Sequence, residues 1–427
     1  MLPTDRQWKF LHPRIDQDQL KESKSYCSLM RLGLGLSLGM IRVVASKEMC
    51  KLFGGLRILS TCAMSTSSRV STKSDIPAIS VRRAASTLSA NSELSIDDTP
   101  LGSGNAEGTA LLSGLDVYQV PSHMDGHPLS VYGIHSTTNV DPSRRPILLC
   151  HGRTWSSVPV FHLLGGRPGS RSTMESLWET ETLQPYCMDF RGFGGTPHDS
   201  TGEVTPHTCV SDVESVLEWI AQLHGNLTND DDSALPALLG WSQGALVTQL
   251  AAQRSPHLIS KLILYGSIYD PLVRYPRAPL YAFATLSPPS PHAKDEVDRV
   301  VLASVVEQVP NTYDAAIEDF TIEGTIAPEP ARQFAHAALL ADPYKAKWTA
   351  LHEFNNVDPA RVHVPTLIMA GDQDPYAPLR VQQELFCNLG RGADRSWTIL
   401  SGADHAVHLL DNGRERFVKT VKNFCET

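Results

Sequence analysis

Short apolar segments alternate with segments of helical periodicity from residue 115 to the end of the chain. Six of these segments are rich in apolar residues and are expected to form strands: 146–150, 185–190, 234–239, 261–265, 365–370 and 396–400. Buried parallel strands need crossover connections, which are usually helices. The alternation therefore predicts a mainly parallel sheet with helices on both faces.

Two further strands are expected before these runs, at 117–120 and 129–134, with Asp125-Gly126 in the turn between them. They bring the expected sheet to eight strands. Apolar residues recur at helical spacing over 208–224 and again between Phe417 and Phe424, and a further helix is expected over 246–253. The fold class predicted from this order is α/β.

Residues 271–360 interrupt the alternation, because they contain no convincing strand. The segment begins with several prolines and continues with helical patterns near 294–309, 315–320, 331–340 and 345–353. It is too long for a plain loop. We expect a helical cap (residues 271–360) over the C-terminal edge of the sheet, dividing the core into 109–270 and 361–427.

The first 108 residues differ in composition from the rest. Between residues 23 and 91 only Glu48 and Asp75 are acidic, against ten lysines and arginines, and serine and threonine are frequent. This composition is typical of an organellar transit peptide or of a disordered extension. The expected location is cytoplasmic, with a mitochondrial location as the alternative. The apolar run 32–41 is shorter than the roughly 18–20 residues of a membrane span, so no stable span is expected.

The charge and the cysteines exclude several classes of protein. The net charge is −9, and no basic block marks the region after residue 108, which argues against nucleic-acid binding. The eight cysteines are irregularly spaced and form no C-x-x-C pair, so we expect reduced thiols and no metal site. No cofactor is expected, and the oligomeric state stays open.

Ser242 is the candidate nucleophile. It lies in Gly240-Trp241-Ser242-Gln243-Gly244, which follows an apolar strand and opens a helix. That is the context in which G-x-S-x-G forms a nucleophile elbow, a tight turn that exposes the serine oxygen. The helix N-terminus lies where negative charge would develop.

The acid and the base follow in the chain order Ser, acid, His. Asp374, after the strand at 365–370, is the expected acid, while Asp372 is interpreted as structural and Asp270 as an alternative acid. His405, after the last strand, is the expected general base. His408 is interpreted as a surface or cap-facing residue.

The oxyanion donors are expected to be two backbone N–H groups, those of Gln243 and of Arg153 after His151-Gly152, with Thr154 behind. The Arg153 side chain is then free for another use. It either points to solvent, pairs with an acid such as Asp189, or binds a carboxylate or phosphate of the substrate.

Trp155 and Trp241 are candidates for lining an acyl pocket, with ordinary packing as the alternative. Asp189 and Arg191 are expected to brace the loop that follows their strand.

Five fragments carry a family resemblance: HG at 151, DFRGFG from 189, GWSQG from 240, GDQD from 371 and GADH from 402. Over residues 115–427 the chain resembles the α/β-hydrolase superfamily, in its capped esterase and C–C hydrolase-like branch. Arg153 is a departure, since many members carry an apolar or amide residue there. The resemblance implies a serine hydrolase that cleaves a small-molecule carboxylic ester or thioester through an acyl-enzyme.

Two alternatives stay open at this point. The same three side chains serve C–C bond hydrolysis or acyl transfer to an acceptor other than water, and the difference lies in cap shape and water access. A third possibility is a non-catalytic ligand-binding protein on a hydrolase fold.

Overall fold

The computed structural model describes residues 81–83, 111–134, 140–225, 235–276, 309–318, 320, 322–392 and 394–427. All of them lie in one compact unit, Asp75–Thr427. Within the predicted N-terminal extension (1–108) only residues 81–83 are described. The rest of that extension lies outside the described residues, and so does the helix expected near 294–309 apart from Val309.

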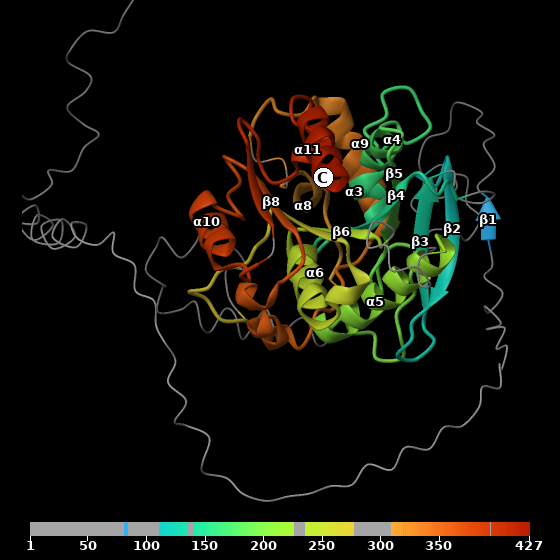
Figure 1. Ribbon diagram of the computed structural model, residues 1–427. Coiled ribbons are helices and arrows are strands. Elements are labelled where there is room, and N and C mark those ends of the chain that lie inside the picture. Colours follow the sequence, from blue (N-terminus) through green and yellow to red (C-terminus); the bar gives the residue numbers. More distant parts are fainter. Residues whose placement is uncertain are drawn as a thin grey trace, which may run out of the picture. The chain divides into compact units, whose positions relative to one another are not determined.

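The core is one sheet in which the described residues form nine strands, ordered β1-β2-β3-β5-β4-β6-β7-β8-β9 (Figure 1). Their bounds are β1 Val81–Arg83, β2 Leu115–Pro121, β3 Pro128–Ile134, β4 Arg145–Cys150, β5 Leu183–Met188, β6 Ala237–Trp241, β7 Lys261–Tyr265, β8 Thr366–Gly371 and β9 Arg395–Leu400. The eight predicted strands are confirmed as β2–β9. The ninth, β1, pairs antiparallel with β2 and lies within the segment expected to be an extension.

The order in which successive strands are added to the sheet reverses at β4. This strand pairs in parallel with β5 on one side and with β6 on the other. The connection after β4 therefore leads to one half of the sheet, and the connection after β5 leads to the other half. Cys150 stands opposite Gly240 in this register. Ligands of open α/β sheets bind at such a reversal, outside the carboxyl ends of the strands. The segments that start at His151 and at Ser242 therefore emerge side by side.

Helices cover both faces of the sheet. One face carries α3 (Ser157–Phe161), α4 (Thr173–Trp178) and α11 (Arg414–Glu426), and the other carries α5 (Pro206–Leu223), α6 (Gln243–Arg254) and α10 (Leu379–Asn388), as Figure 1 shows. Strands β4 to β8 are apolar because both of their faces are covered, whereas the last strand, β9, is largely exposed. No described helix combines the length and the apolar composition needed to cross a bilayer.

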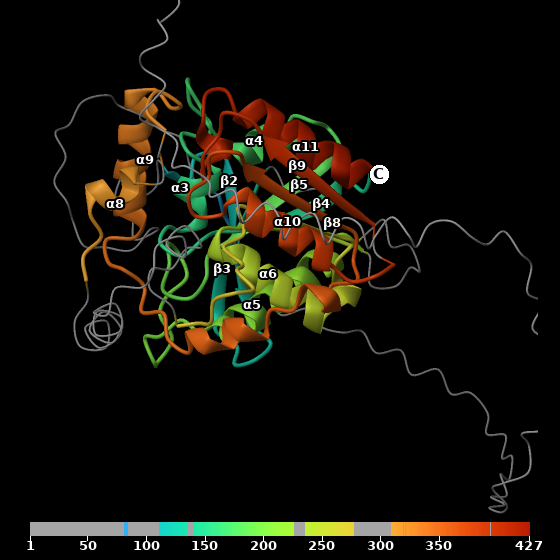
Figure 2. The same cartoon turned by 90° about the vertical axis from the view of Figure 1, so that its left-hand side faces the viewer.

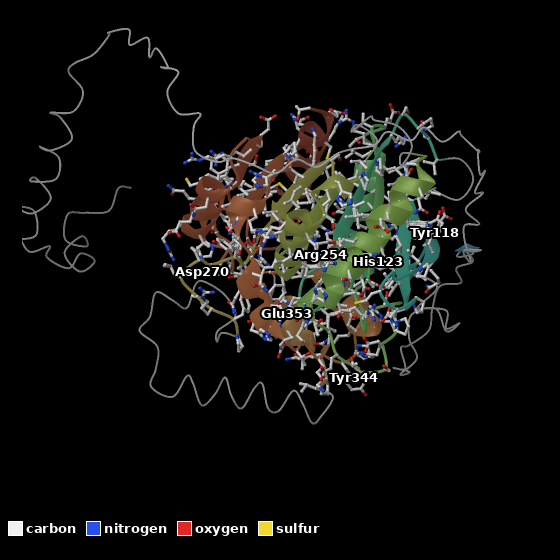
Figure 3. The ribbon with its side chains drawn as sticks, turned by 60° about the horizontal axis from the view of Figure 1, so that its bottom comes forward. Tyr118, His123, Arg254, Asp270, Tyr344 and Glu353 are labelled. Carbon is white, nitrogen blue, oxygen red and sulfur yellow. The ribbon has the colours of Figure 1, made fainter. Side chains whose placement is uncertain are left out.

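Helix α5 illustrates how local signals and packing agree. Its N-terminus is capped by the Thr205 side chain, which accepts a hydrogen bond from the backbone of Thr208. Its inner face packs on the sheet, and the Trp219 ring lies 4.9 Å from that of Tyr118 in β2. Tyr118 and His123 lie along this helix in Figure 3. The predicted helix over 208–224 is thus confirmed within two residues at its start.

The segment between β7 and β8 is helical but only in part as predicted. Helices α8 (Tyr313–Ile317) and α9 (Pro328–Ala341) confirm the expected ones, and two short 3-10 helices follow, Leu351–Asn356 and Pro359–Arg361. In Figure 2, α8 and α9 lie to one side of the core, next to α3.

The helical stretch expected near 345–353 is wrong for residues 345–350, whereas residues 351–353 begin the 3-10 helix Leu351–Asn356. In residues 345–350 the backbone bonds to other segments: Lys347 O accepts from Val204 N, and Thr349 N donates to Val204 O. Pairing with a distant segment satisfied these groups in place of helical hydrogen bonds.

Arg191 joins three parts of the core, as expected of a bracing residue. Its guanidinium is almost fully buried and pairs with Asp212 in α5, with Asp125 in the β2–β3 turn and with Asp199. Burial alone would lower the pKa of Arg191, but the hydrogen bonds to Asp212 and Asp125 outweigh it and raise the pKa.

We expect Arg191→Ala to lower the free energy of unfolding by about 3–5 kcal/mol, because it leaves the buried carboxylate of Asp212 without its cation. Arg332→Ala is the control, since its ion pair with Glu329 is exposed and such pairs contribute no more than about 1 kcal/mol. Urea denaturation of both variants measures the difference. Equal losses would contradict the bracing role.

Candidate active site

Ser242 has a backbone conformation that L residues rarely adopt. It lies between β6 and α6 with φ 58° and ψ −121°. Ser242 N donates to Tyr265 O at 2.9 Å, and Ser242 O accepts from Ala245 N at 3.1 Å, so both of its peptide groups are held. Strain of this kind persists only where the surroundings impose it, and it gathers at functional sites.

This turn requires glycine at positions 240 and 244, because no side chain fits at either position. A Cβ on Gly240 would lie 2.2 Å from Thr248 Oγ1 and 2.5 Å from Gly244 O. A Cβ on Gly244 would lie 2.2 Å from His151 O. Strand β6, helix α6 and the segment after β4 therefore approach one another closely, which explains the G-x-S-x-G pattern physically.

His405 and Asp374 are joined by a buried hydrogen bond. His405 Nδ1 lies 2.8 Å from Asp374 Oδ2, and Asp374 Oδ1 accepts from the backbone N–H groups of Tyr376 and Ala377 at 2.8 and 2.9 Å. A carboxylate that accepts at Oδ2 places the proton of the neutral ring on Nδ1. Nε2 is then the basic nitrogen.

The loop that carries His405 is anchored to the strand that carries the serine. Trp241 Nε1 and Tyr265 Oη both donate to His405 O, at 3.0 and 2.9 Å, and the Trp241 ring centroid lies 5.2 Å from that of His405. Since Trp241 is the residue before Ser242, this bond couples the position of His405 to that of Ser242.

The other two carboxylates shape turns. Asp372 Oδ1 accepts from Gly402 N and Ala403 N, at 2.7 and 3.3 Å, and so fixes the turn that leads to His405. Asp270, labelled in Figure 3, accepts from Leu272 N at 3.0 Å. Of the three aspartates, Asp374 is the one that the described structure bonds to His405.

The interpretation of His408 as a surface or cap-facing residue is wrong. The short helix Val407–Leu409 turns its side chain inward, where it is fully buried. Its Nδ1 lies 3.0 Å from Tyr265 Oη, and its ring packs edge-on against Trp241. Burial lowers its pKa to about 3, so the ring is neutral and supports the two side chains that hold His405.

His151 sets the conformation of the segment after β4. Phe190 N donates to His151 Nε2 at 3.1 Å, so the ring proton is on Nδ1, which donates to Gly152 O at 2.9 Å. Burial lowers the pKa of His151 to about 3, which keeps the ring neutral. A Cβ on Gly152 would lie only 3.1 Å from Ser242 Cβ. This segment therefore lies against the serine.

Arg153 does not pair with Asp189, the partner considered in the sequence analysis. Asp189 accepts from Tyr132 Oη and from the backbone N–H groups of Ser157 and Gly195. The Arg153 guanidinium is half-buried and donates to Gln243 Oε1 at 3.2 Å.

Both candidate pocket tryptophans are buried against other protein side chains. Trp155 is 2 % exposed, and its ring meets that of Phe334 from α9 edge-on, 6.5 Å between centroids. Trp241 packs on His405 and His408. These contacts favour the packing interpretation of each ring.

Two buried aspartates hold together the loops that follow β4 and β5. The carboxylate of Asp342, at the end of α9, accepts from Ser156 N and Gly194 N at 2.7 and 3.0 Å. Asp189 accepts from the next residue of each loop, Ser157 N and Gly195 N, at 2.8 and 3.0 Å. We call this arrangement the double aspartate clamp.

The sequence reasoning missed Asp342, because a single aspartate after an expected helix gives no signal of its partners. In the fold it ties the segment 328–342 to the loop that follows Arg153.

The family model described as the alpha/beta hydrolase family matches residues 147–420, well over half of the chain. The chain belongs to the alpha/beta hydrolase family. Among solved structures, this hydrolase-family chain is similar to a thermophilic esterase from Thermogutta terrifontis, with TM-score 0.50 and 18% identity, covering 73% of this chain and 98% of that one. It is also similar to an esterase from Exiguobacterium antarcticum, with TM-score 0.51 and 21% identity, covering 72% and 99%. None of the curated proteins matches it significantly. At these identities the likeness shows the fold.

The double aspartate clamp predicts a pH dependence of stability in this alpha/beta hydrolase. Burial raises the pKa of Asp342 to about 7, above its value in the unfolded chain, although its hydrogen bonds oppose the shift. Between about pH 4 and pH 7 the folded chain therefore holds more protons at this residue, so its contribution to the free energy of unfolding falls as pH rises.

We expect the loss of stability between pH 5 and pH 7.5 to be smaller in Asp342→Asn than in the wild type, as measured by urea denaturation at each pH. Asp141→Asn is the control, because the pKa of that exposed group is lowered and it stays ionised over this range. A variant with the wild-type dependence on pH would show that Asp342 does not titrate there.

Proposed function

We propose that this chain is a capped serine hydrolase that cleaves carboxylic esters or thioesters through an acyl-enzyme on Ser242. The observation that carries the proposal is the buried bond between His405 Nδ1 and Asp374 Oδ2, on a loop tied by Trp241 to the strained serine turn. An acid, a base and a nucleophile in this relation are what acyl transfer to serine needs.

In the first half of the reaction, Ser242 Oγ attacks the carbonyl carbon and its proton passes to His405 Nε2. The tetrahedral intermediate collapses, the bond to the leaving oxygen or sulfur breaks, and His405 returns the proton to the leaving group. In the second half, water attacks the acyl-enzyme while His405 takes its proton. The acid then leaves and Ser242 regains its hydrogen. Asp374 fixes the ring orientation and stabilises the imidazolium throughout.

Two backbone N–H groups would stabilise the oxyanion. Gln243 is the first residue of α6, where N–H groups lack intrahelical partners and the helix dipole favours negative charge. Arg153 N–H belongs to the segment that Gly152 brings against Ser242. Trp348 Nε1 donates to Arg153 O at 3.0 Å and helps to fix that peptide before substrate binds.

The cap is part of the proposal. Phe334 and Asp342 of α9, and Trp348 beyond it, contact Trp155, Ser156 and Arg153 of the loop that would carry the oxyanion donor. The segment 271–360 would thus shape the acyl site and control the entry of water. That control is also what would separate ester hydrolysis from C–C cleavage or acyl transfer.

We expect a fluorophosphonate to form one adduct on the wild type and none on Ser242→Ala, as measured by intact mass. Turnover of short-chain 4-nitrophenyl esters should vanish in the same variant. His405→Ala should lose nearly as much activity, because an unassisted hydroxyl is a poor nucleophile. If folded wild type forms no adduct, the non-catalytic binding protein becomes the better description.

A second prediction concerns the acid. Asp374→Asn should lower kcat by about 10³–10⁴-fold, because an amide at this position cannot favour the required tautomer or stabilise the imidazolium. Asp270→Asn is the matched control and should retain most activity, since Asp270 accepts from the backbone of Leu272. Steady-state kinetics of both variants, after circular dichroism confirms folding, decide the assignment. An inactive Asp270→Asn beside an active Asp374→Asn would reverse it.

A further inference from the structure

The charge of Arg153 is not balanced within the described residues. No aspartate or glutamate there forms an ion pair with its guanidinium, and the hydrogen bond to Gln243 Oε1 goes to a neutral amide. Burial lowers the pKa of Arg153, and the nearby Tyr275 is the one group that opposes this shift. An unpaired, partly buried cation is unfavourable, because it loses hydration without gaining a counter-charge.

Two other arginines with little exposed side-chain area have carboxylate partners: Arg191 pairs with three aspartates and Arg171 with Asp411. Arg145 and Arg414 are partly buried and donate to backbone carbonyls of Cys425 and Ser170. Arg153 differs from these four in its partner, a side-chain amide on the residue next to Ser242.

The position of Arg153 is fixed by its neighbours. Its backbone carbonyl accepts from Trp348 Nε1, and its side chain reaches the residue next to Ser242. Tyr275 is held in place by Asn355, which accepts from Tyr275 N and donates to Tyr275 O, at 2.8 and 2.9 Å. A cation held at one place beside a reactive group is suited to orienting a substrate.

Around Arg153 and Gln243, the described side chains offer more hydrogen-bond donors than acceptors. Gln243 Oε1 is used by Arg153, and among the described residues Gln243 Nε2 is buried without an acceptor. A guanidinium and an amide N–H group next to each other match the oxygens of a carboxylate, for which the planar guanidinium has the best geometry.

We propose that Arg153 binds a carboxylate on the acyl part of the substrate, so that the preferred substrates are monoesters or monothioesters of dicarboxylic acids. The proposal rests on the function proposed above. The N–H of Arg153 would contact the scissile carbonyl and its guanidinium the distal carboxylate. Because an arginine side chain spans several bonds, the two groups of the substrate should be separated by a few carbon atoms.

The test compares monoethyl glutarate with the neutral ethyl pentanoate, with release of ethanol as the readout. We expect the wild type to favour the anionic ester in kcat/KM by about tenfold to a hundredfold, the range for a hydrogen bond to a charged group. In Arg153→Gln the ratio should fall to about one, and in Arg153→Lys to an intermediate value. The ratio of the two kcat/KM values is unaffected by a substitution that changes the rates of both esters by the same factor.

Arg361→Gln is the control, because this arginine is exposed on the helix Pro359–Arg361 and should leave the ratio at the wild-type value. A binding readout without turnover completes the design: glutarate should slow fluorophosphonate labelling of Ser242 in the wild type and not in Arg153→Gln.

A wild-type ratio near one, or a ratio and glutarate protection that persist in Arg153→Gln, would overturn the role of Arg153. Labelling of Ser242 in the same samples would then show that the hydrolase itself stands. Absence of labelling would instead overturn the function proposed above.

Discussion

The left-handed backbone of Ser242 is the constraint on which the rest of the site depends. It requires three chain segments to meet at distances that no side chain at Gly240 or Gly244 would allow. The reversal of strand order at β4 brings those segments together, because β4 and β6 are neighbours whose C-terminal ends emerge at the same edge. Strain in one residue is thus maintained by the topology of the whole sheet.

Around the Ser242 turn, aromatic and imidazole side chains form hydrogen bonds to the backbone of the surrounding loops. Trp241 and Tyr265 both donate to the carbonyl of His405, and the buried, neutral His408 packs behind them. His151 plays a similar part on the other side of Ser242, where its two nitrogens connect the segments after β4 and β5. Side chains held in this way preorganise a site, since little has to reorient when charge develops.

Buried charge is distributed in two ways near the site. Arg191 and the double aspartate clamp are satisfied by partners within the fold, and they join loops that would otherwise move independently. Among the described residues, the hydrogen-bond partner of the Arg153 guanidinium is the neutral amide of Gln243. Satisfied charges serve structure, whereas the proposed carboxylate site would use the charge of Arg153 beside Ser242.

The sequence by itself determined the parts of this protein that depend on local pattern. Apolar segments located six of the eight main strands, the Asp125-Gly126 turn marked the pair before them, and G-x-S-x-G between a strand and a helix located the serine turn. Burial and tight turns impose their residue types locally. Only the tertiary structure decided the features that depend on distant partners. Residues 345–350 are not helical because Val204 pairs with Lys347 and Thr349, and His408 is buried because Tyr265 and Trp241 pack against it. The partners of Asp342 and of Arg153 were decided in the same way, because the environment of a charge depends on its neighbours in space, and sequence spacing does not reveal them.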